Sequence, residues 1–227
     1  MFQGFTDATV DFMWGIRFNN ERAWFEAHKQ EYLEQFYRPM RELGDELFDH
    51  VAPQLEGFPL MGKVSRIYRD ARRLHGRGPY KDHLWTAVEV PHEQYQPVPS
   101  FWFELGPEGW SCGMGCYMPK PMTMAKLRAR IRNNPAEMEK LTRRLRRQSG
   151  LQLVSPQYKR PKPGAPSDLL APWFSSKGYT ICHDDVLTDD LFSREIVDRV
   201  KEYYDFLVPF YRYFATLDGD PVPEERT

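Results

Sequence analysis

The apolar residues along the chain change their spacing twice, from helical to alternating and back to helical. Residues 7–55 carry apolar side chains at helical intervals, and Leu43, Leu47 and Val51 form the clearest stripe. Residues 84–117 instead alternate apolar and polar positions, as half-buried strands do. Helical spacing returns after Thr123 and again from about Thr188. Helices at both ends and strands between them predict an α+β fold.

The middle of the chain predicts an antiparallel meander. Its expected strands are VSRIYRD (64–70), LWTAVEV (84–90), SFWFEL (100–105) and WSCGMGCY (110–117). Gly106–Gly109, reading GPEG, is a strong hairpin signal, and 179–182 adds a further short strand. We therefore predict one domain over 1–217, with the meander packed against the N- and C-terminal helices. An acidic tail over 218–227 is expected to fray.

Individual helix positions carry further expectations. The apolar positions of the first helix are Val10, Trp14 and Phe18. Asn19-Asn20 interrupts that helix and is expected to cap the next, because an Asn side chain accepts bonds from free backbone N–H groups. In the helix after Thr123, Leu127 and Ile131 are expected to face inward. The cations expected on its exposed sides are Lys126, Arg128, Arg130 and Arg132.

The charge of the protein is balanced in total but segregated along the chain. The formal net charge is −1. By direct count, residues 60–83 sum to about +5 and residues 120–162 to about +11. Segregated positive charge favours an anionic partner at one surface.

Several protein classes are excluded by composition. An apolar share of 41% is typical of a globular protein rather than a disordered one. Three cysteines in 227 residues do not make a disulfide framework. No apolar run is long enough to span a bilayer, and the N-terminus lacks the features of a signal peptide. We expect a cytoplasmic, soluble protein with no membrane partner.

The candidate site lies between Arg66 and His83, where cations and aromatic residues surround a Gly-x-Gly-Pro corner. Arginine suits the binding of phosphate or carboxylate because its planar fork grips two oxygens at once. We therefore predict a cleft that binds an anionic small molecule; whether it also catalyses a reaction stays open. The predicted ligand-binding residues are Arg66, Arg69, Asp70, Arg72, Arg73, His75, Tyr80 and Lys81.

Two alternatives accompany this prediction. The basic helices over 126–147, with the YKR segment 158–160, are a candidate nucleic-acid surface, although the neutral total charge disfavours a broad footprint. Alternatively, Arg66, Asp70 and Arg72 form a structural ion network without a ligand.

The sequence contains no phosphate-binding loop and no Gly-x-Ser-x-Gly elbow. Cys112 and Cys116, with Cys182-His183 elsewhere, lack the tight spacing of zinc ligands. His83 and His75 are conceivable bases, although surface histidines are the commoner explanation. We expect no metal and no cofactor, and the oligomeric state is left open.

The motifs together resemble a known family. They are an NN-x3-WF-x3-K-x2-Y element at 19–32, SRIYRDAR followed by PYKDH, GCYMP-x-P, and YKRP at 158–161. In this order they resemble the domain-of-unknown-function family 2461, which is found in bacteria and fungi. The resemblance covers nearly the whole chain and implies a single α+β domain. It supplies no established activity and no catalytic residues.

The chain departs from the family pattern inside the candidate site. Family members commonly read RD-x-RFS-x-DK-x-PYK, whereas this chain reads RDARRLHGRGPYK over 69–81. The family's serine and acidic residue are therefore missing here. The residues that carry over are Arg66, Arg69, Asp70, Tyr80 and Lys81.

Overall fold

The computed structural model describes residues 1–70, 72, 74, 76–91, 98–116 and 118–223. Within them, one antiparallel sheet has the strand order β1-β2-β3-β4-β6-β5. The strands are β1 (Met61–Val64), β2 (Leu84–Glu89), β3 (Ser100–Gly106), β4 (Gly109–Gly115), β5 (Gln152–Leu153) and β6 (Ile181–Val186). The predicted α+β class is confirmed, and β2, β3 and β4 are the expected meander. The single-domain boundary at 217 stays a prediction.

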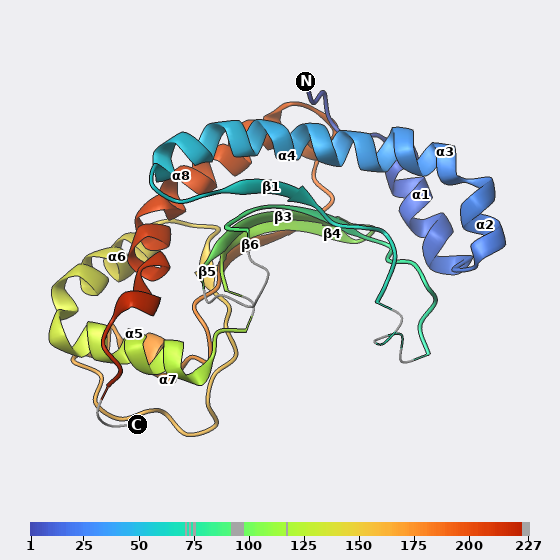
Figure 1. Ribbon diagram of the computed structural model, residues 1–227. Coiled ribbons are helices and arrows are strands. Elements are labelled where there is room, and N and C mark those ends of the chain that lie inside the picture. Colours follow the sequence, from blue (N-terminus) through green and yellow to red (C-terminus); the bar gives the residue numbers. More distant parts are fainter. Residues whose placement is uncertain (71, 73, 75, 92–97, 117, 224–227) are drawn as a thin grey trace.

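The helices lie on one face of the sheet and beyond both of its ends (Figure 1). The two longest, α4 (Arg38–Val51) and α8 (Glu195–Ala215), cross the same face. At one end lie α1 (Asp7–Phe18), α2 (Arg22–Ala27), α3 (Lys29–Glu31) and a π-helical turn (Tyr32–Tyr37). At the other end lie α5 (Pro121–Asn133), α6 (Pro135–Arg147) and α7 (Ala171–Ser175). None of the helices within the described residues is both long and apolar enough to cross a bilayer.

The covered face of the sheet packs closely against α4. A Cβ atom at Gly44 would lie 2.2 Å from Thr86 Oγ1, so the absent side chain lets the helix backbone approach β2. Leu84 and Val88 flank Thr86 on this face and are buried, as the alternation in β2 predicts. From β3 and β4, Phe101 and Cys112 complete the same buried surface.

The opposite face carries a row of polar and aromatic side chains. Trp85 pairs with Glu104, Glu104 with Ser111, and Ser111 with Asp184, across four neighbouring strands. Directly paired residues of antiparallel strands point to the same side of a sheet. Trp85, Glu104 and Ser111 are half-buried and Asp184 is exposed. This row therefore lines the open face, away from α4 and α8.

The strand expected over 64–70 is wrong beyond its first residue. The ladder between β1 and β2 ends at Val64, and Ser65 Oγ then accepts a hydrogen bond from the backbone N–H of Trp85 at 3.1 Å. The Ser65 hydroxyl thus takes the place of a backbone carbonyl as the acceptor for Trp85, and the regular pairing of β1 with β2 ends there. The strand expected over 179–182 is shifted and longer, running from Ile181 to Val186.

The packed face of α1 is not the one that carries Val10, Trp14 and Phe18. The buried residues are Thr9, Phe12, Met13 and Ile16. Phe18 is 75% exposed. Phe12 instead packs against Tyr32 and Phe36, with ring centroids 5.7 and 6.3 Å apart. Apolar residues surround α1 on several sides, so spacing alone did not select the packed face.

Three of the four cations expected on the surface of α5 are used inside the molecule. Arg128 is only 4% exposed and donates to the backbone carbonyls of Phe174 and Ser176 at 2.9 and 3.1 Å. Lys126 donates to the carbonyl of Asp218, and Arg130 pairs with Asp220 at 2.6 Å. The start of the tail that was expected to fray is therefore anchored to α5.

Replacing Arg128 with Leu is expected to lower the free energy of unfolding by about 2–3 kcal/mol, because two buried carbonyls lose their donor. Arg146→Leu on the exposed side of α6 is the matched control and should change it by less than about 0.5 kcal/mol. Chemical denaturation of both variants measures the difference. If Arg128→Leu and the control have equal free energies of unfolding, the Arg128 hydrogen bonds make no net contribution to stability.

Candidate functional site

The segment from Arg66 to His83 folds back on itself beside the edge of the sheet. Tyr68 and Tyr80 form an isolated antiparallel bridge. The backbone N–H of Lys81 donates to the carbonyl of Ile67 at 2.7 Å, and that of Arg69 to Pro79 at 2.8 Å. These bonds bring the two halves of the basic segment together, as the Gly-Pro corner suggested.

Asn20 fixes this segment to the end of α1. Its Oδ1 accepts from the backbone N–H of Tyr80 at 2.9 Å, and its Nδ2 donates to the Tyr80 carbonyl at 3.0 Å. Gly78 is required beside it, because a Cβ atom there would lie 2.1 Å from Asn20 Oδ1. The expectation that Asn20 caps a helix is wrong, since Glu21 holds the N-cap position of α2. The amide instead satisfies both backbone groups of Tyr80.

Tyr80 itself is a packing residue. Its side chain is 3% exposed and stacks on Phe25 with ring centroids 4.3 Å apart. Burial raises the pKa of the Tyr80 hydroxyl. Tyr80 therefore supports the neighbouring groove from behind, and Tyr68, which is 51% exposed, presents the accessible ring.

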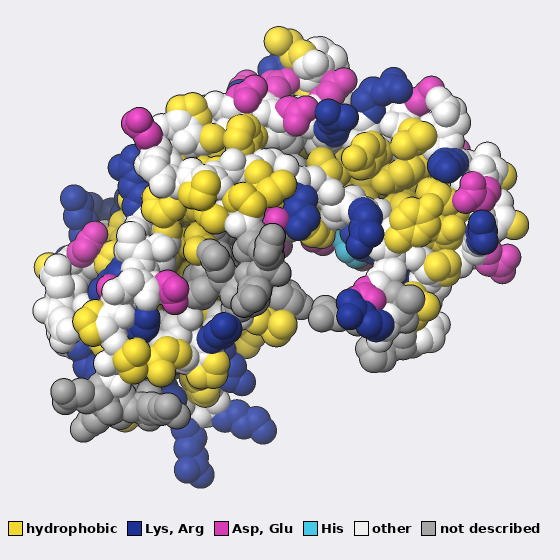
Figure 2. Space-filling view, viewed as in Figure 1, with side chains coloured by type: hydrophobic (Ala, Val, Ile, Leu, Met, Phe, Trp, Pro, Cys, Tyr) yellow, Lys and Arg dark blue, Asp and Glu magenta, His cyan; other side chains and the backbone are white. Residues whose placement is uncertain are grey.

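A groove of about 890 Å³ opens along this segment and the adjoining edge of the sheet. Of the predicted ligand-binding residues, its lining includes Arg66, Arg69, Asp70, Arg72 and Lys81. Arg73 and His75 lie outside the described residues. The lining also includes Lys63, Arg77, His83 and Trp85, which the site prediction did not contain. Figure 2 shows Lys and Arg side chains bordering the hollow between the two ends of the molecule.

Some of the groove cations are already paired. Arg72 binds both carboxylate oxygens of Asp70, at 3.0 and 2.8 Å. Lys63 pairs with Glu89 at 2.9 Å, across the edge of the sheet. Arg69 donates to the carbonyl of Tyr80 at 2.7 Å, which fixes its guanidinium at the back of the groove.

Arg66, Arg77 and Lys81 differ from these cations. Among the described residues, none of the three forms an ion pair. Lys81 is half-buried, and burial lowers the pKa of its ammonium group to about 8. Glu104 opposes this lowering of the pKa, whereas Arg69 and Arg66 add to it. The groove therefore holds an excess of positive charge, part of it poorly hydrated.

Asp82 lies in the chain between the groove residues Lys81 and His83 and binds groups from three directions. Its carboxylate accepts from Arg17 Nε at 2.6 Å and lies 3.0 Å from His83 Nδ1 and 3.9 Å from Arg69 Nη2. The hydrogen bond with His83 holds the Asp82 pKa well below its usual range, and Arg17 contributes in the same direction against the effect of burial. Asp82 therefore stays ionised and orients the imidazole of His83.

His83 also borders a second hollow of about 350 Å³ on the open face of the sheet. Its lining includes Glu104, Ser111 and Asp184 from the polar row. The groove is rich in cations, whereas the second hollow is rich in acidic side chains. His83 lies in the lining of both. The polar row was missed from the sequence because its members lie on separate strands. Only the pairing register brings them together.

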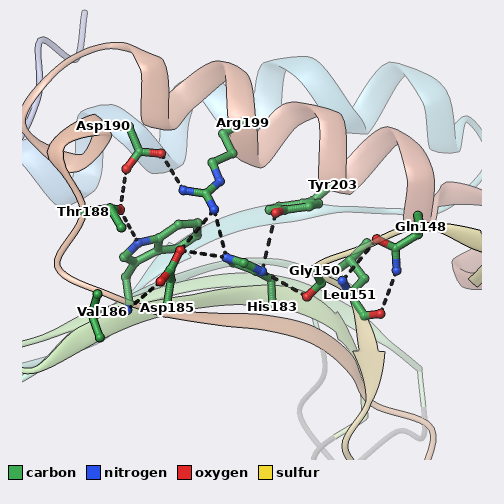
Figure 3. Close-up of polar contacts among 11 residues, drawn as sticks. Gln148, Gly150, Leu151, His183, Asp185, Val186, Thr188, Asp190, Arg199 and Tyr203 are labelled. Atoms are coloured by element: carbon green, nitrogen blue, oxygen red, sulfur yellow. Dashed lines mark hydrogen bonds and ion pairs between the residues drawn. The ribbon is translucent and has the colours of Figure 1, made fainter. Parts of the chain in front are cut away.

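A separate polar network joins β6 to α8 and does not belong to the groove (Figure 3). Arg199 binds Asp185 and Asp190 at 3.1 and 2.8 Å and lies 3.3 Å from His183 Nε2. His183 Nδ1 lies 3.0 Å from the carbonyl of Gly150, so the proton is assigned to Nδ1 and Nε2 accepts from Arg199. Because these polar groups bind one another, we interpret the network as structural.

The cysteines do not form a site within the described residues. Cys112, Cys116 and Cys182 are buried free thiols. Burial raises the pKa of Cys182 to about 12, and nearby Asp184 adds to the increase. Burial raises the pKa of Cys112 as well, so the thiols of Cys112 and Cys182 are kept protonated. No group of three or more His, Cys, Asp or Glu side chains in the described part of the chain is placed to hold a metal ion.

Comparison with known proteins places the whole fold in one family. A family model described as "Conserved hypothetical protein (DUF2461)" matches residues 8–213. The chain belongs to the DUF2461 family. The match spans both hollows and both long helices, so the resemblance drawn from the motifs is confirmed. No curated protein matches the sequence.

Asp82→Asn is expected to lower the free energy of unfolding at pH 7 by about 2 kcal/mol, because it leaves Arg17 without its partially buried partner. The folded-state pKa of Asp82 is depressed, so its contribution is present above the unfolded value of about 3.9 and is lost as the pH falls below it. The stabilities of the wild type and Asp82→Asn should therefore begin to converge below about pH 4 and meet only as the pH falls through the depressed folded-state pKa. Asp168→Asn, at an exposed position, is the control. A stability difference that does not change with pH would contradict this assignment.

Proposed function

We propose that the groove of this DUF2461 protein binds a small molecule that carries a phosphate or carboxylate group. The observation that carries the proposal is the presence of Arg66, Arg77 and Lys81 on its lining without an ion pair among the described residues. Of the three, Lys81 is half-buried, and a partly buried cation holds its charge at a cost that an anionic ligand relieves.

The dimensions and chemistry of the groove support a small ligand. Its volume of about 890 Å³ lies within the range of about 300–1,000 Å³ that small-molecule pockets occupy. Asp70 holds the Arg72 guanidinium by two bonds, and the Tyr80 carbonyl holds that of Arg69. Guanidinium groups fixed in this way lose little side-chain freedom on binding an oxyanion.

The proposal of a purely structural network of Arg66, Asp70 and Arg72 receives less support. The Asp70–Arg72 pair is local and its arginine is 87% exposed, and exposed pairs contribute little to stability. Arg66 forms no ion pair with a described residue. The ion network that does tie elements together in this region is centred on Asp82 and uses Arg17 and Arg69.

The nucleic-acid proposal is also weakened, because it needs the cations of α5 at the surface. Lys126, Arg128 and Arg130 bind backbone or acidic groups within the fold. The cations left on α6, such as Arg144 and Arg147, border a separate hollow near Phe206. A small anion in the groove is therefore the better supported function.

Arg66→Ala and Arg77→Ala are each expected to weaken binding of inorganic phosphate or pyruvate about tenfold to a hundredfold, the effect of one hydrogen bond to a charged group. Isothermal titration with each anion measures this, and Arg146→Ala on exposed α6 controls for net charge. Equal affinity in the wild type and both groove variants would overturn the proposal. Tight binding of single-stranded DNA that Arg146→Ala weakens would favour the nucleic-acid alternative.

The affinity for the anion is expected to fall as the pH rises through about 8, because Lys81 then loses the proton that the ligand stabilises. The decrease between pH 7 and pH 9 should be about tenfold, the effect of about 1.4 kcal/mol. In Lys81→Arg the cation keeps its charge over this range, so the dependence should disappear. Titrations with L-lactate, whose own carboxylate does not titrate here and which has no ketone, test it. The same pH dependence in Lys81→Arg would exclude Lys81 as its source.

A further inference from the structure

We propose that Lys81 forms a covalent imine with the carbonyl group of a 2-oxo acid bound in the groove. The inference rests on the proposed function, because the groove cations are needed to bind the carboxylate. It goes beyond that function by giving one lysine a chemical role and by naming the substrate class.

The position of Lys81 is the first support. Lys81, His83 and Trp85 lie at alternate positions of the chain that leads into β2, with a bend at Asp82 between the first two. All three line the groove. Lys81 Nζ lies 5.8 Å from the centre of the Trp85 ring and has no ion pair among the described residues. Its amine is thus available to a molecule that enters the groove.

A second lysine in the same groove provides an internal comparison. Lys63 Nζ lies 5.7 Å from the centre of the same Trp85 ring. Lys63, however, pairs with Glu89 at 2.9 Å and its side chain is 47% exposed. The charge of Lys63 is therefore compensated and hydrated, whereas Lys81 is half-buried and has no ion pair among the described residues. The two lysines share a groove and an aromatic neighbour but differ in how far the cation is stabilised.

The chemistry requires an amine that is uncharged at neutral pH. Desolvation and neighbouring cations activate lysines for Schiff-base formation. Burial disfavours the charge of Lys81 most, and the neighbouring Arg69 and Arg66 act in the same direction, whereas Glu104 opposes them. Relative to an ordinary lysine, a pKa of about 8 raises the fraction of free amine at pH 7 by about two orders of magnitude.

The substrate class follows from the arrangement of charge. A carboxylate bound by Arg66 or Arg77 lies within the groove that Lys81 lines. In a 2-oxo acid the carbonyl carbon is bonded directly to the carboxylate carbon, so binding the anion keeps the electrophile nearby. An aldehyde or ketone without a carboxylate lacks the anionic group that Arg66 and Arg77 would bind.

The reaction balances without a further reactant. The Nζ lone pair of Lys81 forms a bond to the carbonyl carbon, and the C=O π pair moves to oxygen. Transfer of a proton from nitrogen to that oxygen gives a carbinolamine. Protonation of its hydroxyl and loss of water then give the iminium ion. His83 lines the same groove as Lys81 and is oriented by Asp82 through Nδ1 at 3.0 Å, so it is assigned to carry this proton.

Reductive trapping tests the inference directly. The full-length protein is incubated with pyruvate and sodium cyanoborohydride, and the adduct is located by intact mass and peptide mapping. We expect one adduct per chain, at Lys81 rather than at Lys63, because the Lys63 ammonium group is held in an ion pair with Glu89. Lys63→Arg should retain the adduct, and Lys81→Arg and Lys81→Met should abolish it. Mapping the wild-type protein gives an answer even if a Lys81 variant fails to fold.

The outcomes separate this inference from the proposed function. Titration with L-lactate, a carboxylate without a ketone, measures anion binding alone. If lactate binding depends on Arg66 and Arg77 but no adduct forms at Lys81, the imine is excluded and anion binding stands. If lactate does not bind and no adduct forms, both are excluded. An adduct spread over surface lysines, or one that is unchanged in Lys81→Arg, also overturns the assignment.

Discussion

Both long helices lie on the same face of the sheet, and the rest of the molecule depends on this one-sided packing. The close approach of α4 at Gly44 and the crossing of α8 bury the apolar side chains of β2, β3 and β4. The other face is then left to polar and aromatic residues, and the helices at each end of the sheet border it. This face needs no helix to cover it, because the apolar side chains of the sheet are already buried against α4 and α8.

The segment 66–83 joins this open face to the helices at one end. Asn20 holds the backbone of Tyr80, and Asp82 connects Arg17 of α1 with His83 at the start of β2. Both contacts are polar and partly buried, so their geometry is strongly specified. Lys81 lies between these two anchored positions. Its partial burial is therefore a consequence of how its neighbours are fixed.

Features that depend on a local pattern could be predicted from the sequence. Features that depend on contacts between residues far apart in the chain could not. Alternation located β2, β3 and β4, and the density of arginine located the groove. The Asn-Asn pair predicts a helix cap, which is wrong because Asn20 binds Tyr80, a residue distant in the chain. Arg128 was placed at the surface because a helical pattern does not reveal the carbonyls of Phe174 and Ser176. Glu104, Ser111 and Asp184 required the strand register.

The attachment of residues 218–220 to α5 has a consequence for the order in which the chain acquires its structure. Arg130 binds Asp220 and Lys126 binds the carbonyl of Asp218, so α5 lacks these partners until the last part of the described chain has been synthesised. The end of the molecule that contains α5, α6 and α7 therefore reaches its final packing only after translation has passed this point. The α1–α3 end, whose partners lie within the first part of the chain, can be complete while the ribosome is still at work.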